Sequence, residues 1–235
     1  MNFTGLSLEQ APPLSAPARF FITAPIFGMI AALLILWTDP ALLISRYSIE
    51  SIAITHLFTI GIFSMVMLGA LQQMLPVLAG VSLPKAAGVA AFSHIALVLG
   101  VFFMSIGLWQ NDKNFIILAA IGLGLGFFSI LIAIILAMKK ITFFTPTVKA
   151  MMTAVAFAFV IVLIGLHLLG AHAAGNIGNL HMALANTHSV WAIFGFAGIL
   201  IIGVAFQVLP MFYVTPHFKK FYNNVVIPLI MFGLT

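Results

Sequence analysis

Histidine is the residue type in this sequence that best suits metal or proton chemistry. The chain has seven histidines, four acidic residues and no cysteine. The acidic residues, Glu9, Asp39, Glu50 and Asp112, fall in the flanks of apolar segments or in the connections between them. Paired-carboxylate catalysis and an acidic proton relay inside a membrane are therefore unsupported. Without thiolates, a transition metal would need histidine or methionine ligands.

Two histidines lie near the start of apolar segments of similar sequence. The first segment, 54–80, reads ITHLFTIGIFSMVMLGALQQMLPVLAG, and the second, 186–212, reads NTHSVWAIFGFAGILIIGVAFQVLPMF. An ionisable side chain inside such a segment is costly unless it faces a protein interior, and neutral imidazole is a natural ligand of haem iron and copper. His56 and His188 are therefore candidate metal ligands. The alternative is that each histidine bonds only to a backbone carbonyl or a lipid headgroup.

The two segments form a repeat. Aligned without gaps at an offset of 134 residues, both contain the pattern G-x-x-x-Q-x-L-P, which begins at Gly69 in one segment and at Gly203 in the other. The glutamines of this pattern are Gln73 and Gln207. Because both segments should run in the same direction and lie four helices apart, we interpret them as a parallel repeat, and repeats often build a site at their interface. Small residues at these positions also allow close helix packing without any chemistry.

The histidines themselves do not match in this alignment. His56 precedes Gly61 by five residues, whereas His188 precedes Gly195 by seven. At about 100° per residue of an α-helix, the two histidines would point to different sides of their glycines.

Three further histidines, His167, His172 and His181, fall near the same ends of the apolar segments. They are possible additional ligands, although no H-x-x-x-H or H-x-H spacing places two of them on one helix face. We interpret His94 as packed or hydrogen-bonded, and His217 as solvated among lysines. The methionines are typical of gap filling in an apolar bundle, although thioether is also a soft copper ligand.

The apolar segments that carry these residues predict an all-α, polytopic transmembrane helix bundle. With 63% hydrophobic and 6% charged residues, the chain cannot cover itself with a polar surface, and its apolar runs of about 20 residues match a bilayer. We see no alternating strands of the kind that build a membrane barrel. The predicted spans are 19–38, 51–80, 87–109, 114–138, 149–171 and 186–213, with the start of a seventh near 224.

We expect two regions along the chain. Residues 1–18 form a polar N-terminal segment without the features of a cleavable signal. Residues 19–235 form a single transmembrane domain, and because the last apolar run is too short to span a bilayer, we expect the chain to be a fragment of a longer protein.

Basic residues predict the orientation of the bundle. Seven Lys and Arg residues flank one set of helix ends and two flank the other, so the positive-inside rule places the N-terminus in the cytoplasm and His56 and His188 near the outer face of a cell (inner) membrane. The basic residues are scattered through short connections, so a lipid bilayer is the expected partner and nucleic acid is not.

The two repeated segments resemble the second and sixth helices of subunit I in the haem-copper oxidase superfamily, nearest in style to cbb3-type oxidases and nitric oxide reductases. The resemblance implies that His56 is an axial ligand of a low-spin haem and that His188 binds copper or non-haem iron. It also implies a third such helix with two histidines beyond the present chain, and partnership with other respiratory membrane subunits or a cytochrome. The sequence departs from A-type oxidases at Ala192, where those enzymes have a tyrosine.

These observations favour a haem-binding membrane protein that handles electrons or a small gas such as O₂ or NO. If it is an enzyme, it would be an oxidoreductase of the terminal oxidase or nitric oxide reductase type. The alternatives are a small permease or metal-ion carrier, with Gln73 and Gln207 lining its path, and a non-catalytic accessory subunit.

Overall fold

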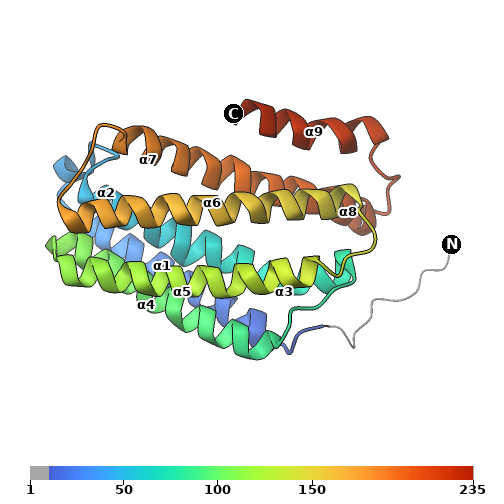
Figure 1. The fold of residues 1–235 in the computed structure, drawn as a ribbon, viewed down its shortest axis with the longest axis horizontal. Coiled ribbons are helices and arrows are strands. Elements are labelled where there is room, and N and C mark those ends of the chain that lie inside the picture. The colour runs from blue at the N-terminus through green and yellow to red at the C-terminus, as the bar shows by residue number, and fades with distance from the viewer. Residues whose placement is uncertain (1–10, 235) are drawn as a thin grey trace.

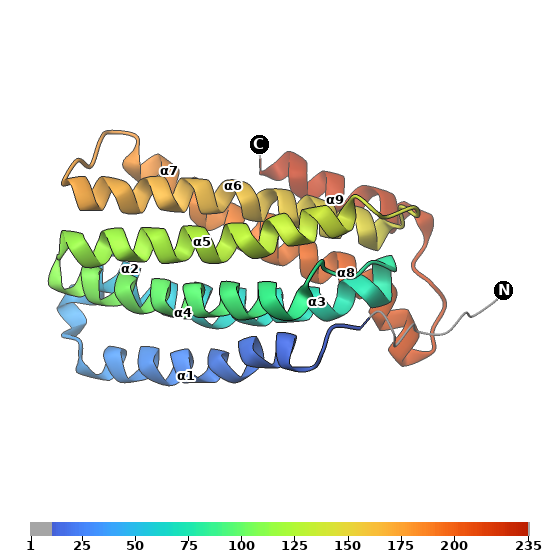
Figure 2. The same ribbon diagram turned by 60° about the horizontal axis from the view of Figure 1, so that its bottom comes forward.

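The computed structural model describes residues 11–234 and shows a bundle of long antiparallel helices (Figures 1 and 2). Within this range every regular element is helical, which confirms the all-α prediction. Six helices are long and apolar enough to cross a membrane, and they cover Ser15–Trp37, Ile49–Ala79, Ala86–Gln110, Lys113–Met138, Pro146–Ala174 and His181–Tyr213. The predicted span ends lie within five residues of these bounds. Residues 1–10 of the predicted N-terminal segment lie outside the described range.

Four of the six spans are single α-helices, and two are composite. The single helices are α1 (Ser15–Trp37), α4 (Ala86–Gln110), α5 (Lys113–Met138) and α6 (Pro146–Ala174). The second span consists of α2 (Ile49–Phe58), the π-helical segment η3 (Thr59–Ser64) and α3 (Met65–Ala79). The sixth span consists of α7 (His181–Val190), the π-helical segment η4 (Trp191–Gly198) and α8 (Ile199–Tyr213). A short 3₁₀ helix, η2 (Pro40–Leu43), lies in the first connection.

The seventh predicted segment is helix α9 (Lys220–Gly233), which begins four residues before the expected start near 224. It packs against α6, α8 and η4 (Figure 1). The indole Nε1 of Trp191 in η4 donates a hydrogen bond to the backbone carbonyl of Leu234, at 3.0 Å. Leu234, the last described residue, is thus hydrogen-bonded to the sixth span.

Polar side chains cap the N-termini of helices that follow short connections. Asp112 accepts hydrogen bonds from the backbone N–H groups of Asn114 and Phe115 in the first turn of α5. Thr145 accepts one from Val148 at the start of α6. These caps satisfy backbone donors that the helix itself leaves unpaired, which allows each chain reversal to be short.

Glu50 requires a correction, because the prediction placed all four acidic residues outside the spans, in flanks or connections. The side chain of Ser48 accepts a hydrogen bond from the backbone N–H of Ser51, so α2 begins at Ile49 and Glu50 lies in its first turn. A carboxylate is favourable there because the helix N-terminus carries partial positive charge. Glu50 is therefore part of the second span, at its outermost turn.

Glycines allow close packing between pairs of helices. Gly61 in η3 packs against Phe27 of α1, and a Cβ added at Gly61 would lie 2.6 Å from that ring. Gly195 in η4 packs against Phe157 of α6, and a Cβ there would lie 2.5 Å away. Helix α1 therefore packs closely on the second span, and α6 packs closely on the sixth.

The sides of the bundle are apolar. Large side chains that are mostly exposed along the helices include Ile22, Met29, Phe63, Ile95 and Ile121. A continuous apolar surface of this kind is unfavourable in water and suits lipid. The protein is therefore a multi-pass membrane protein surrounded by a lipid bilayer.

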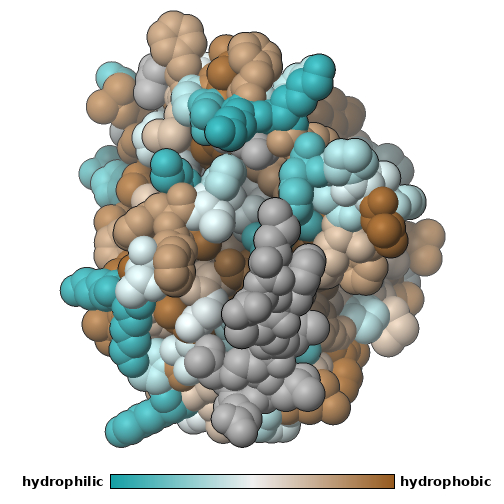
Figure 3. All heavy atoms as spheres, turned by 90° about the vertical axis from the view of Figure 1, so that its right-hand side faces the viewer, coloured by the Kyte–Doolittle hydropathy of each residue, from teal (hydrophilic) through white to brown (hydrophobic). Residues whose placement is uncertain are grey.

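The two ends of the bundle differ in chemistry. We call the basic end the one that holds the start of α1 and the connections 80–85, 139–145 and 214–219, and the histidine end the one that holds the connections 38–48, 111–112 and 175–180. Basic residues concentrate at or near the basic end, namely Arg19, Lys85, Lys139, Lys140, Lys149, Lys219 and Lys220. Figure 3 looks onto this end and shows hydrophilic side chains projecting from several parts of it.

Candidate functional site

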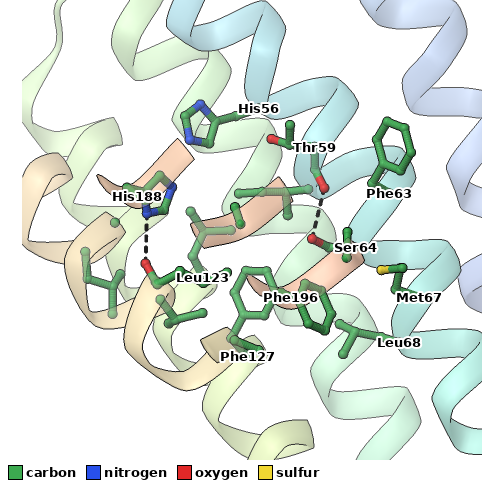
Figure 4. A pocket seen from close by; sticks show the side chains of 18 of the residues that line it. His56, Thr59, Phe63, Ser64, Met67, Leu68, Leu123, Phe127, His188 and Phe196 are labelled. Carbon is green, nitrogen blue, oxygen red and sulfur yellow. Dashed lines mark hydrogen bonds between the residues drawn. The ribbon is translucent and has the colours of Figure 1, made fainter. Parts of the chain in front are cut away.

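The structure brings together the two histidines that the sequence analysis singled out. The ring centroids of His56 in α2 and His188 in α7 are 6.1 Å apart, and the ring planes differ by 25°. Figure 4 shows the two rings facing each other, with the nitrogen of His188 that makes no hydrogen bond on the side of His56.

Backbone carbonyls orient both rings. The Nδ1 atom of His56 lies 2.8 Å from the carbonyl oxygen of Ile52, and that of His188 lies 2.9 Å from the carbonyl oxygen of Ile161. A carbonyl oxygen only accepts hydrogen bonds, so in each neutral ring Nδ1 carries the proton and donates it. Each Nε2 then keeps its lone pair and is available to a metal. Histidines that bind metals are commonly held in this way.

Gly165 in α6 leaves space for the ring of His188. A Cβ added at Gly165 would lie 2.9 Å from Cε1 of His188, closer than carbon atoms normally approach. The absence of a side chain at Gly165 therefore allows the observed position of the imidazole.

The histidine pair adjoins an inner cavity of about 330 Å³ (Figure 4). The cavity lies between the second span, α4, α5, α6 and the sixth span. Apart from the two histidines, its polar lining residues are Thr59 and Ser64. Both hydroxyls donate to backbone carbonyls, Thr59 to that of Thr55 and Ser64 to that of Thr59, each at 2.9 Å. The cavity is therefore essentially apolar.

The pair also adjoins an outer cavity of about 330 Å³ at the histidine end. Two of the additional histidines, His172 and His181, line it, and their rings meet edge to face with centroids 5.1 Å apart. Arg46 and Tyr47 line it as well. Because His56 and His188 line both cavities, the pair lies where the apolar inner cavity meets the outer cavity, which has more polar lining residues.

The other histidines lie apart from this site. His167 is exposed on α6 and lines neither cavity, and His217 is exposed at the basic end. The hydroxyl of Thr23 donates to the carbonyl of Arg19 at 2.7 Å and lies 2.7 Å from Nε2 of His94, so this nitrogen is the donor to Thr23. This hydrogen bond agrees with the interpretation of His94 as a bonded, packed residue.

The glutamines of the repeat do not line the site. Gln73 and Gln207 are half-buried and are absent from the walls of both cavities. The adjacent Gln72 is instead fully buried: its Nε2 donates to the carbonyl of Leu68 at 3.1 Å, and its Oε1 has no hydrogen-bond partner. The structure gives no support to a path lined by Gln73 and Gln207.

The π-helical segments explain why the spacing of the histidines from their glycines is misleading. His56 lies three residues before η3, and His188 lies three residues before η4. A π-helix forms i to i+5 hydrogen bonds and so has more residues per turn than an α-helix. The assumption of about 100° per residue therefore fails between each histidine and its glycine.

Two imidazoles are the available donors at the centre of the site. Among residues 11–234, no group of three or more His, Asp or Glu side chains is arranged to hold a metal ion. Two imidazoles on opposite sides of one metal, each bonded through Nε2 at about 2 Å, would have centroids about 6 Å apart. The observed centroid distance of 6.1 Å is close to this value. Haem iron suits such a pair because the porphyrin supplies its other ligands, whereas structural zinc requires four.

No known protein family, curated protein or solved structure matches the chain. The resemblance to subunit I of the haem-copper oxidases therefore rests on the two histidine-bearing segments.

Sequence reasoning missed three residues of the site, Arg46, Tyr47 and Gly165. Arg46 was a visible signal, because it is one of only two basic residues at the histidine end. The role of Gly165 depends on a contact between α6 and α7, which no local pattern indicates.

Proposed function

We propose that the protein is a haem-binding integral membrane protein in which His56 and His188 supply the two axial ligands of one haem. The observation that carries this proposal is the 6.1 Å spacing of two rings whose Nε2 atoms are both free. The proposal departs from the family resemblance, which gives His188 to a separate copper or non-haem iron. Haem with two histidine ligands exchanges single electrons and has no open position for a gas, so we favour electron transfer over O₂ or NO binding.

The chain's own residues support this role in distinct ways. The carbonyls of Ile52 and Ile161 hold the rings in the required tautomer, and Gly165 leaves room for one of them. The apolar lining of the inner cavity would disfavour water on one side of the pair. An electron partner would be a cytochrome or another respiratory membrane subunit.

The proposal includes the orientation in the membrane. With the basic end in the cytoplasm, as the positive-inside rule favours, the N-terminus is cytoplasmic and the histidine pair lies near the outer face of the inner membrane. A partner would then deliver or accept electrons on that side.

The proposal also includes the parallel repeat. Helix α1 with the second span would form one unit, and α6 with the sixth span would form the other. In support, Gly61 packs on Phe27 in the first unit, Gly195 packs on Phe157 in the second, and each unit contains a π-helical segment beyond its histidine. The histidine pair would then lie at the interface of the repeats, where such proteins commonly build sites.

Visible absorption spectroscopy of the purified chain tests the proposal. Protein supplied with haem should show the sharp reduced bands of a six-coordinate, low-spin haem. His56→Ala and His188→Ala should each abolish this spectrum without loss of membrane insertion, because each removes one axial ligand. His167→Ala is the matched control, since it removes an exposed imidazole at the same end that lines neither cavity. A colourless wild type, or an unchanged spectrum in His188→Ala, would contradict the proposal.

A metal-ion carrier is the second candidate, because four histidines line the outer cavity. Copper suits imidazole and thioether ligands, and Met182 lines the same cavity. In that case the haem-free protein should bind copper, and His172→Ala should reduce the bound copper as much as His188→Ala does. Under the haem proposal, His172→Ala leaves the haem spectrum unchanged.

A further inference from the structure

Arg46 contributes a positive charge to the outer cavity. This charge has no role in the proposed metal binding by His56 and His188. Arg46, from the connection 38–48, lines this cavity. The residues that line it, all within the described range, include no Asp or Glu. A guanidinium without a carboxylate partner, facing a cavity at the edge of an apolar bundle, favours an anionic occupant.

Arg46 is held in place by two neighbours. Its Nη2 donates a hydrogen bond to Oδ1 of Asn186 at 2.8 Å, and its guanidinium carbon lies 5.0 Å from the centroid of the Tyr47 ring. The Tyr47 hydroxyl donates to the same Asn186 oxygen, also at 2.8 Å. Asn186 lies two residues before His188 in α7. The guanidinium is therefore positioned by the helix that carries a proposed haem ligand.

Most donors of Arg46 remain available. A guanidinium has five N–H groups, and the hydrogen bond to Asn186 uses one of them. Within residues 11–234, Arg46 makes no other hydrogen bond. The remaining donors form a planar fork that matches the two oxygens of a carboxylate.

We propose that Arg46 binds a carboxylate in the outer cavity and, resting on the proposed function, that this carboxylate is a propionate of the haem held by His56 and His188. Haem has an apolar ring and carries its two carboxylates on one edge. The site is divided in the same way as the haem. The apolar inner cavity suits the ring, the outer cavity that contains Arg46 suits the carboxylates, and the two cavities meet at the histidine pair. Arg46 thus sets which edge of the haem faces the histidine end.

Titration of the full-length apoprotein with two haems tests this inference. The first is haem b, and the second is its dimethyl ester, which has the same ring and iron but no free carboxylate. Soret absorbance gives a dissociation constant for each. Wild-type protein should bind the ester roughly 10- to 100-fold more weakly, because charge-assisted hydrogen bonds to the propionate are lost. The difference should shrink as salt is added, since Arg46 is exposed.

Variants assign the effect to Arg46. Arg46→Gln should bind haem b as weakly as wild type binds the ester and should not distinguish the two haems. Arg46→Lys should recover part of the discrimination, because it restores the charge without the planar fork. Lys113→Gln, which removes the other basic residue at the histidine end, should behave as wild type, since Lys113 does not line the cavity.

The outcomes separate this inference from the proposed function. Wild-type protein that binds both haems equally overturns the role of Arg46 and leaves the histidine ligation standing. Retained discrimination in Arg46→Gln also overturns it and assigns the propionate to another group. If the wild type binds neither haem, both proposals fail. The wild-type comparison of the two haems requires no variant, so misfolding of Arg46→Gln would not remove the test.

Discussion

His56 and His188 each lie three residues before a π-helical segment, and their rings meet with centroids 6.1 Å apart. The two histidines therefore occupy the same position relative to a π-helical segment. Both rings also donate Nδ1–H to a backbone carbonyl, so the two Nε2 atoms are chemically alike.

The ring planes give a spectroscopic prediction. Because the imidazole planes differ by only 25°, oxidised haem bound between them should give a rhombic low-spin EPR spectrum with three resolved g-values. Perpendicular imidazoles would instead give a single, strongly anisotropic low-field signal. EPR of the oxidised wild-type protein distinguishes the two arrangements, and a spectrum of the perpendicular type would contradict ligation by the rings in their observed orientation.

Gly165→Ala should weaken haem binding. The added methyl group would lie 2.9 Å from Cε1 of His188 and would displace the ring. We expect roughly tenfold weaker binding in a haem titration, comparable to the loss of a group that orients a metal ligand. Gly170→Ala on the same helix is the control, because its Cβ would meet no atom within 4 Å. Equal affinities of the two variants would show that the ring position is not critical.

Gln72→Met should stabilise the protein. The side chain of Gln72 is fully buried and its Oε1 has no hydrogen-bond partner, so removing the amide relieves a desolvation cost of about 1–3 kcal/mol. Thermal unfolding in mild detergent should show the gain. Gln73→Met, at the half-buried neighbouring position, should change stability by less than about 0.5 kcal/mol. Destabilisation by Gln72→Met would show that Oε1 accepts a hydrogen bond in the folded protein.

Gly69→Leu should reduce the yield of folded protein without acting on the haem site. A Cβ at Gly69 would lie 3.2 Å from Phe20 and Phe21 of α1, so a larger side chain would separate α1 from α3. Gly88→Leu on α4 should be tolerated, because a Cβ there meets no atom within 4 Å. Size-exclusion chromatography of both variants measures the folded fraction. A loss of haem from Gly69→Leu at full yield would contradict a purely packing role.

Single cysteines test the proposed orientation, since the chain has none of its own. Thr142→Cys lies in an exposed position at the basic end, and Gln110→Cys lies in an exposed position at the histidine end. In intact cells, a membrane-impermeant thiol reagent should label Gln110→Cys and leave Thr142→Cys unlabelled until the cells are opened. The reverse pattern would place the N-terminus outside.

The helical bundle was predictable from the sequence because its causes are local. Apolar runs of about 20 residues identify spans wherever they occur, and residues such as Asp112 and Thr145 mark helix starts. The start of the second span was predicted two residues too late, because Ser48 caps the helix and α2 begins at Ile49, before Glu50.

The site was only partly predictable. His56 and His188 stand out because each is an ionisable group inside an apolar segment. Their distance from each other depends on two π-helical segments, which no residue spacing shows. The repeat pattern pointed to Gln73, whereas its neighbour Gln72 is fully buried. A difference of one residue decides which side chain faces the core, and the helix phase shifts at η3.

The π-helical segments let the second span hold one extra residue without moving its histidine. Loss of a single codon within Thr59–Ser64 could return the span to continuous α-helix, with almost no change in its length. Because a π-helical turn contains one more residue than an α-helical turn, this deletion would also leave His56 at nearly the same angle relative to the inner half of the span. In evolutionary terms, one residue could be inserted or deleted at this position while the histidine pair stays together.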